Sequence, residues 1–202
     1  NGMDVSRKTV EEAEELIATD VSDYTVFLKL RGGKQENIDG GLMDFSYVSD
    51  GAVQDLKDTQ NSFLWLSAVF HPTTYTMTAQ TTYDPDMLKK ALESLDCFDG
   101  EKITKPKDAE IKETDEGYVI EPEVEGDELD AAQVYELVKA AVDAGETEVD
   151  LEAGDCYKKP AVTKEDKQLT AKAEKLNKYF HEVITYHVGG TQVILDYSTI
   201  RD

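Results

Sequence analysis

The sequence predicts an α+β fold, built as two related units in tandem, each a mixed or antiparallel sheet with hairpins and amphipathic helices packed on it. Alternating apolar and polar residues on both sides of glycine-containing turns predict the hairpins. Apolar residues at three- and four-residue spacing behind capping side chains predict the helices. Because strands and helices are interspersed, we expect the helices to cover one face of each sheet.

The first eighty residues begin with a helix and a hairpin. Thr9 and Glu12 have the spacing of a capping box, and the apolar residues that follow predict a helix up to residue 20. Alternation over residues 24–30 predicts a strand that turns at Gly32 and Gly33. The further expected elements are a weaker return strand over 34–39, an extended segment over 42–48, a short helix over 51–60, an apolar core cluster over 63–66 and a strand over 73–83.

A boundary between the two units is expected near Asp84, which divides the chain into an N-terminal unit over 1–83 and a second unit over 84–202. Asp84 and Pro85 predict a helix start, since aspartate caps free amides and proline fits the first turn. A polar loop leads into a hairpin, helix and strand over 109–152, with Asp130 as the helix cap and Gly145 as its end. A helix capped by Thr163 and a hairpin over 182–197 complete the unit.

An internal echo indicates that the two units are related. The run from Gly2 through a helix to Val26 resembles the run from Gly126 through a helix to Val149, if two residues are inserted before the second strand. Both runs predict a helix, a strand, an extended segment and a second helix. We therefore interpret the chain as two copies of one supersecondary pattern.

The charge balance excludes some partners. The chain has 43 acidic and 21 basic residues and a net charge of −22. Such a chain lacks the basic surface that nucleic acids or an anionic membrane would require, so we expect neither as a partner. The acidity either keeps the protein soluble and monomeric, or helps it bind a ligand that carries amino groups. No apolar run approaches the roughly 20 residues of a membrane helix.

Cys97 and Cys156 are the only cysteines. A disulfide between them would close a loop of about 60 residues and stabilise an exported domain by about 4 kcal/mol in the chain-entropy model. Two buried, inert thiols are the alternative. Spacing alone does not decide between them.

No catalytic, metal or cofactor site is predicted from the residues. His71, His181 and His187 are too scattered for a zinc site. The acidic run over 121–127 imitates the start of a calcium loop, but Ala132 stands where the bidentate glutamate belongs. We therefore expect a solvated turn there, with no metal and no cofactor.

A longer pattern carries a family resemblance. The run GYVIEPEVEGDELDAAQVYELVKAAVDAGETEVDLEAGDCYKKPAVT over 117–163 is continued by residues 176–179, 184–186, 189–190 and 196–200. It resembles the peptidoglycan-binding domain that precedes the catalytic domain in many Gram-positive L,D-transpeptidases and that also occurs in VanW-like surface proteins. The resemblance covers residues 85–202, and residues 1–16 are similar to the segment before that domain.

The resemblance implies an extracytoplasmic, non-catalytic module that binds peptidoglycan, through its glycan or stem peptide, or positions a catalytic domain further along the same chain. The family's Ser-His-Gly-Cys-Ile/Val-Arg type motif has no match around Cys97 or Cys156, so the chain itself is not expected to be an enzyme. It begins at Asn1 without a leader, so we expect a fragment of a parent anchored by an upstream membrane segment.

Tyrosines are the remaining candidates for a ligand surface, because their rings stack on sugars while their hydroxyls form hydrogen bonds. The candidates in the resembling region are Tyr118, Tyr157, Tyr186 and Tyr197. Each of them has a place at the edge of a core as its alternative. The alternative function is a purely structural spacer, or an accessory domain of a VanW-like surface protein, with no ligand of its own.

Overall fold

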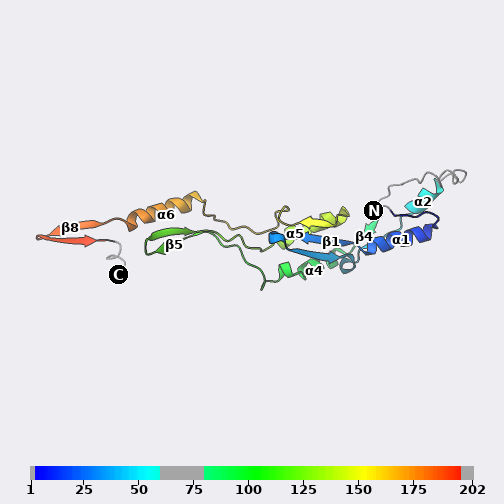
Figure 1. Ribbon diagram of the computed structural model, residues 1–202, viewed down its shortest axis with the longest axis horizontal. Helices are drawn as coiled ribbons and strands as arrows, with labels where there is room; N and C mark the ends of the chain where they lie inside the picture. Colours follow the sequence, from blue (N-terminus) through cyan, green and yellow to red (C-terminus); the bar gives the residue numbers. More distant parts are fainter. Residues whose placement is uncertain (1–2, 60–79, 197–202) are drawn as a thin grey trace. The chain divides into compact units, whose positions relative to one another are not determined.

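The computed structural model describes residues 3–59 and 80–196, and this part has an α+β fold (Figure 1). The chain divides into two compact units that are interleaved along the sequence. Unit 1 comprises Asn1–Asp99 and Ala131–Cys156, and unit 2 comprises Gly100–Asp130 and Tyr157–Asp202. The boundary expected near Asp84 falls inside unit 1, and the chain passes between the units at three points. The domain boundary near Asp84 stays a prediction, and so does the arrangement as two related units in tandem.

Unit 1 is built around a small mixed sheet. Its strands are β1 (Thr25–Lys29), β2 (Gln35–Asp39), β3 (Ser46–Tyr47), β4 (Thr81–Thr82) and β7 (Glu148–Asp150). Its described helices are α1 (Val10–Ser22), α2 (Ala52–Asp58), α4 (Pro85–Glu93) and α5 (Ala131–Asp143), with short 3-10 turns η1 (Arg31–Gly33), η2 (Gly40–Met43) and η3 (Asp96–Phe98). The sheet order is β2-β1-β7, with β2 antiparallel and β7 parallel to β1. Strands β3 and β4 form a separate antiparallel pair.

Two helix starts in unit 1 follow the predicted capping. Thr9 accepts a hydrogen bond from the amide of Glu12, whose carboxylate accepts one from the amide of Thr9. Asp84 caps α4 by accepting from the amides of Asp86 and Met87, and Pro85 occupies the first turn. These contacts satisfy amides that have no partner within a helix.

The core of unit 1 lies between the sheet and its helices. Val26, Leu28 and Ile38 of the hairpin are fully buried, and Leu28 pairs with Val149 of β7. Helices α4 and α5 supply most of the other buried apolar side chains: Leu88, Leu92, Val134, Val138 and Val142. The two segments related by the internal echo thus contribute neighbouring parallel strands, β1 and β7, to one sheet.

The part of unit 2 that the structure describes contains two hairpins and one helix. Strands β5 (Glu110–Thr114) and β6 (Gly117–Glu121) form the first hairpin, and β8 (Ile184–Val188) and β9 (Thr191–Leu195) form the second. Helix α6 (Lys167–Phe180) contacts β5 and β6. Thr163 does not cap this helix as the sequence predicts: Asp166 does, by accepting from the amides of Gln168 and Leu169. Both predicted hairpins are confirmed.

An asparagine fixes α6 on its hairpin. The side chain of Asn177 accepts a hydrogen bond of 2.7 Å from the amide of Tyr118 and donates one of 2.7 Å to its carbonyl. The ring of Tyr118 meets that of Phe180 edge to face at 6.1 Å. Gly117 is required beside this contact, because a Cβ there would lie 2.5 Å from Asn177 Oδ1. The buried apolar side chains of unit 2 are Ala109, Leu129, Tyr157 and Ala173.

Several expected features lie outside the described residues. They are the apolar cluster over 63–66, His71, most of the strand expected over 73–83, and Tyr197.

Candidate functional site

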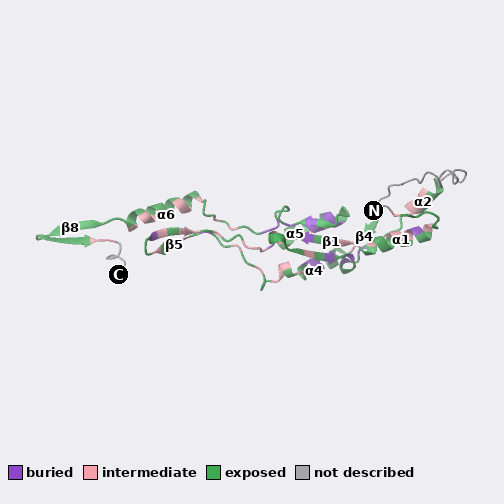
Figure 2. Cartoon of the chain, in the orientation of Figure 1, coloured by how far each residue is buried: buried purple, intermediate pink, exposed green. Residues whose placement is uncertain are grey.

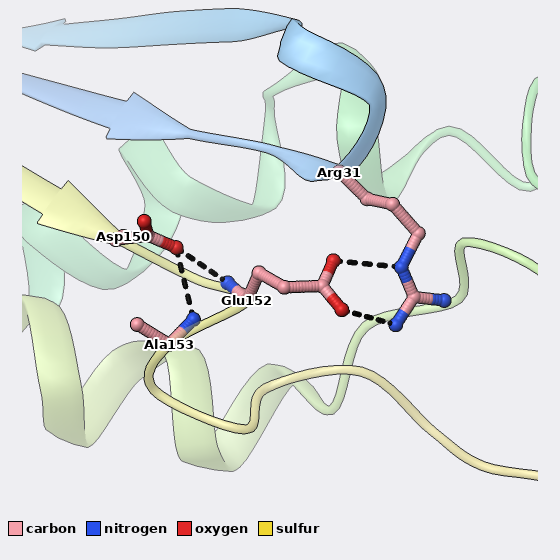
Figure 3. Close-up of polar contacts among 4 residues, drawn as sticks. All are labelled: Arg31, Asp150, Glu152 and Ala153. Atoms are coloured by element: carbon pink, nitrogen blue, oxygen red, sulfur yellow. Dashed lines mark hydrogen bonds and ion pairs between the residues drawn. The ribbon is translucent and has the colours of Figure 1, made fainter.

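The carboxyl ends of β1 and β7 meet at one edge of the unit 1 sheet, where ligands commonly bind in sheets with parallel strands. Just beyond β1, Arg31 makes two contacts with Glu152: Nε to Oε2 at 2.7 Å and Nη2 to Oε1 at 2.8 Å (Figure 3). Asp150 Oδ1 accepts from the amides of Glu152 and Ala153, which holds the turn after β7 (Figure 3). The guanidinium is thereby neutralised and serves the structure of the edge.

A shallow depression opens beside this edge, at the start of β2. It has a volume of about 320 Å³ and is lined by Gln35, Glu36, Asn37, Ser94, Leu95 and Asp96. Glu36 Oε2 accepts a hydrogen bond of 3.0 Å from the amide of Asp96, so β2 is tied to the loop after α4. Carboxylates, amides and a hydroxyl in one hollow can bind the hydroxyl, amide and amino groups of a saccharide or peptide.

Cys97 lies next to the depression as a half-buried, free thiol. Burial, together with the negative charge of Glu36, raises the pKa of Cys97 to about 12, so the thiol stays protonated at neutral pH. Cys156 is fully buried outside a disulfide, and its Sγ donates to the carbonyl oxygen of Gly154 at 3.6 Å. The two cysteines are separate thiols in this structure, and the disulfide considered for this pair stays a prediction.

An aromatic stack crosses the other end of unit 1. The rings of Tyr24 and Phe45 stack at 4.1 Å, and Tyr83 lies at 6.5 Å from Phe45. The hydroxyl of Tyr24 donates to the carbonyl of Glu146. Burial and the charge of Glu146 raise the pKa of Tyr24 to about 12. These rings are half-buried or buried, and they tie the loop after α5 to the rest of unit 1.

The hydroxyl of Tyr83 donates a hydrogen bond of 2.6 Å to Asp143 on α5. Burial, followed by this contact, raises the pKa of Tyr83. Lys139, 2.8 Å away, and then Tyr83 lower the pKa of Asp143. The three side chains connect α5 with the segment before α4, and sequence reasoning did not find them because two of them lie sixty residues apart in the chain.

The predicted tyrosines do not form one surface. Tyr157 is only 6% exposed and belongs to the core of unit 2, paired through its backbone with Leu129. Tyr118 is half-buried against Phe180, whereas Tyr186 of β8 is 51% exposed. Tyr197 lies outside the described residues. A role of any of these rings in binding stays a prediction.

Carboxylates of the calcium-like run make backbone contacts. Glu123 accepts from the amide of Lys164, and Asp127 accepts from the amide of Thr104 at 2.6 Å. Gly126 has a φ of +68° and lies so close to Thr104 that a Cβ would meet its carbonyl oxygen at 2.3 Å. Over residues 3–59 and 80–196, no group of three or more His, Cys, Asp or Glu side chains could hold a metal ion.

Comparison with protein families assigns the chain to a family. A family model described as "Putative peptidoglycan binding domain" matches residues 43–150, which is more than half of the chain. The chain belongs to this family. The match begins and ends earlier than the region of resemblance seen in the sequence, residues 85–202, and spans β3 to β7. Searches of curated proteins and of solved structures gave no match.

Membership of the peptidoglycan-binding family supports a role in binding the cell wall, with peptidoglycan as the partner. It also supports a location outside the cytoplasm. A peptidoglycan-binding domain is non-catalytic in itself. The match includes Ser94, Leu95 and Asp96 of the depression but not Gln35–Asn37. Within the described segments, no helix is long and apolar enough to cross a membrane.

Proposed function

We propose that this chain is a non-catalytic, extracytoplasmic module of a Gram-positive L,D-transpeptidase, which binds peptidoglycan and positions a catalytic domain further along the same chain. The observation that carries the proposal is the family match over residues 43–150. The assignment to an L,D-transpeptidase comes from the resemblance in the sequence. In this role the module works as a monomer, and its parent is held by an upstream membrane segment.

The depression beside β2 is the surface of unit 1 that best fits peptidoglycan. Glu36 and Asp96 bring negative charge to it, and Gln35 and Asn37 bring amides. Stem peptides carry amino groups, which an acidic and polar hollow attracts, while sugar hydroxyls and acetamido groups pair with amide side chains. The acidic composition, which also keeps the protein soluble, thereby gains a role in binding.

Sedimentation with purified sacculi tests the proposal. The sacculi are first treated with hydrofluoric acid, which removes phosphodiester-linked polymers and leaves peptidoglycan. We expect the chain to sediment with this material, and the double variant Q35A/N37A to sediment less. The variant Gln54→Ala on α2, which also removes an exposed amide, is the control and should bind as the original does.

The outcomes separate the site from the function. A chain that stays in the supernatant at low and moderate salt has no peptidoglycan-binding activity of its own. Binding that Q35A/N37A leaves unchanged keeps the function but moves the site elsewhere on the chain.

A structural spacer is the second candidate function, also in the form of an accessory domain of a VanW-like surface protein. Unit 2 favours the spacer, because much of this unit is extended chain that pairs through its backbone. Lys107 forms an antiparallel β-bridge with Val124, and Leu129 forms one with Tyr157. Such a ribbon suits a connector better than a pocket. The same sedimentation experiment decides between the two functions, because a spacer without a ligand does not sediment with the sacculi.

A further inference from the structure

Helix α6 presents four lysines and a tyrosine on one side. The exposed residues Lys167, Lys172, Lys175, Lys178 and Tyr179 are here called the lysine face, and Tyr179 is 55% exposed. Much of α6 is coloured as exposed in Figure 2. Spacings of three, four, seven and eleven residues bring these positions to the same side of a helix. Lys167 and Lys178 lie about 16 Å apart along the helix axis, as the rise per residue requires. The lysine face is thus an extended strip.

The opposite side of α6 holds the helix in place. Ala173 is buried there, Leu169, Leu176 and Phe180 are half-buried, and Asn177 forms its two hydrogen bonds to Tyr118. Because packing and directional hydrogen bonds lie on one side, the lysine face points to solvent from a fixed support.

None of the four lysines forms an ion pair in the described part of the chain. Elsewhere, lysines pair at short distance: Lys29 with Glu148 at 2.6 Å and Lys158 with Glu128 at 2.7 Å. The helix contains one acidic residue, Glu174, which is exposed and lies four residues before Lys178, so it is on the same side as the lysines. Four lysines against one carboxylate leave the face with a surplus of positive charge that is available to an outside ligand, in a chain with a net charge of −22.

The distribution of charge along the chain points the same way. Residues 157–202 hold more basic than acidic residues, whereas residues 1–156 are strongly acidic. An anionic polymer is therefore repelled by most of the molecule and attracted at α6. Carboxylates that lie more than a Debye length from α6, about 8 Å at physiological salt, are largely screened, whereas those of the β5–β6 hairpin that α6 contacts still oppose an anion.

We infer that the lysine face of α6 binds a polyanion built of repeating phosphodiester units, such as the polymers linked to wall peptidoglycan. Lysine is a compact point charge that suits phosphate groups on a flexible chain, while arginine suits planar, bidentate recognition. All four cations are lysines. Tyr179 adds an exposed ring that can pack on the sugar or polyol units between phosphates.

This surface is separate from the peptidoglycan contact proposed above, and it lies outside the matched residues 43–150. It gives the module a second wall component to bind. The two contacts are distinguished by the material used, because hydrofluoric acid removes the phosphodiester polymer and leaves the peptidoglycan.

The test compares untreated with acid-treated sacculi, and uses soluble poly(glycerol phosphate) as the probe for affinity. The variant K167Q/K172Q/K175Q/K178Q removes the face, and glutamine keeps the helix propensity. The variant K8Q/K57Q/K89Q/K90Q is the matched control, since it removes four exposed lysines of unit 1 and changes the net charge equally. Circular dichroism checks that both variants are folded.

Tighter binding to untreated sacculi is expected for the original chain and the control. The α6 variant should lose this difference and at least about tenfold in affinity for the soluble polymer. With four phosphate contacts, log affinity should fall against log salt with a slope of about −3, or about 50-fold between 50 and 200 mM. Equal losses in both variants, equal binding to both kinds of sacculi, or affinity independent of salt would overturn the inference.

Discussion

The hairpins β1–β2 and β8–β9 are both antiparallel pairs of five-residue strands, but they differ in burial. Val26 pairs with Ile38 in the first, and Ile184 pairs with Leu195 in the second. Both hairpins have two glycines with positive φ in the turn. Nevertheless Ile38 is fully buried, whereas Ile184 is 47% exposed. All of β8 is exposed (Figure 2).

The difference comes from what covers each hairpin. Strand β7 extends the first hairpin, and α4 and α5 supply many of the other buried side chains of unit 1. No third strand joins β8 or β9 among the described residues. A two-stranded hairpin alone is marginally stable in water. Equivalent apolar positions therefore stabilise a fold only where further strands or helices cover them and remove them from solvent.

Amide exchange should give the largest contrast. Amides at the centre of β1 open only with much of unit 1, whereas those of β8 open locally. We expect exchange at Val26 and Leu28 to be at least about a thousandfold slower than at Ile184 and Tyr186, because global unfolding costs several kcal/mol more than fraying. Hydrogen–deuterium exchange followed by NMR measures this. Similar protection in both hairpins would break the comparison.

Cys97 measures how closed unit 1 is. With its pKa raised to about 12, only about one thiol in ten thousand is ionised at pH 8, so iodoacetamide should react about a thousandfold more slowly than with the unfolded chain. The rate should rise tenfold per pH unit up to about pH 12. Alkylation after unfolding without reductant is the control, and modification of both cysteines there excludes the disulfide.

Truncating an isoleucine in each hairpin sharpens the comparison energetically. Ile38→Ala leaves a cavity in the core and should lower the free energy of unfolding by about 3 kcal/mol. Ile184→Ala is the same change at an exposed position and should cost less than about 1 kcal/mol. Urea denaturation of the two variants measures both values. Equal costs would mean that the second hairpin is covered in solution.

The ion pair beside β1 should have the smallest effect. Arg31→Gln removes the two contacts with Glu152, a partly exposed pair, and should lower the free energy of unfolding by at most about 1 kcal/mol. Lys112→Gln, at an exposed pair with a 3.6 Å separation in unit 2, should change almost nothing. The effect of Arg31→Gln should shrink at high salt. A larger loss would show that the edge of the sheet depends on charge as well as on burial.

The local elements were predictable because their causes are local. Capping at Thr9 and Asp84 and the turn at Gly189 and Gly190 depend on residues within a few positions. The cap of α6 was misassigned to Thr163 because Thr163 and Asp166 both carry a capping oxygen, and only the path of the chain selects Asp166. The pairing of β1 with β7 has no local signal, since the intervening chain is more than a hundred residues long.

The candidate site was less predictable than the fold. Tyrosines stood out in the sequence by type, yet Tyr157 is buried. The depression joins Gln35–Asn37 with Ser94–Asp96, and the Arg31–Glu152 pair joins residues 121 positions apart. Neither can be recognised before the strands are placed side by side.

By itself, the sequence determined the α+β class, the helix caps at Thr9 and Asp84, the hairpin turns and the acidic charge, because these follow from residue types at short spacing. Tertiary structure decided the interleaving of the two units and the third strand on β1. It also decided which of two similar hairpins is buried. Burial depends on what packs against a surface, and that is a property of distant segments of the chain.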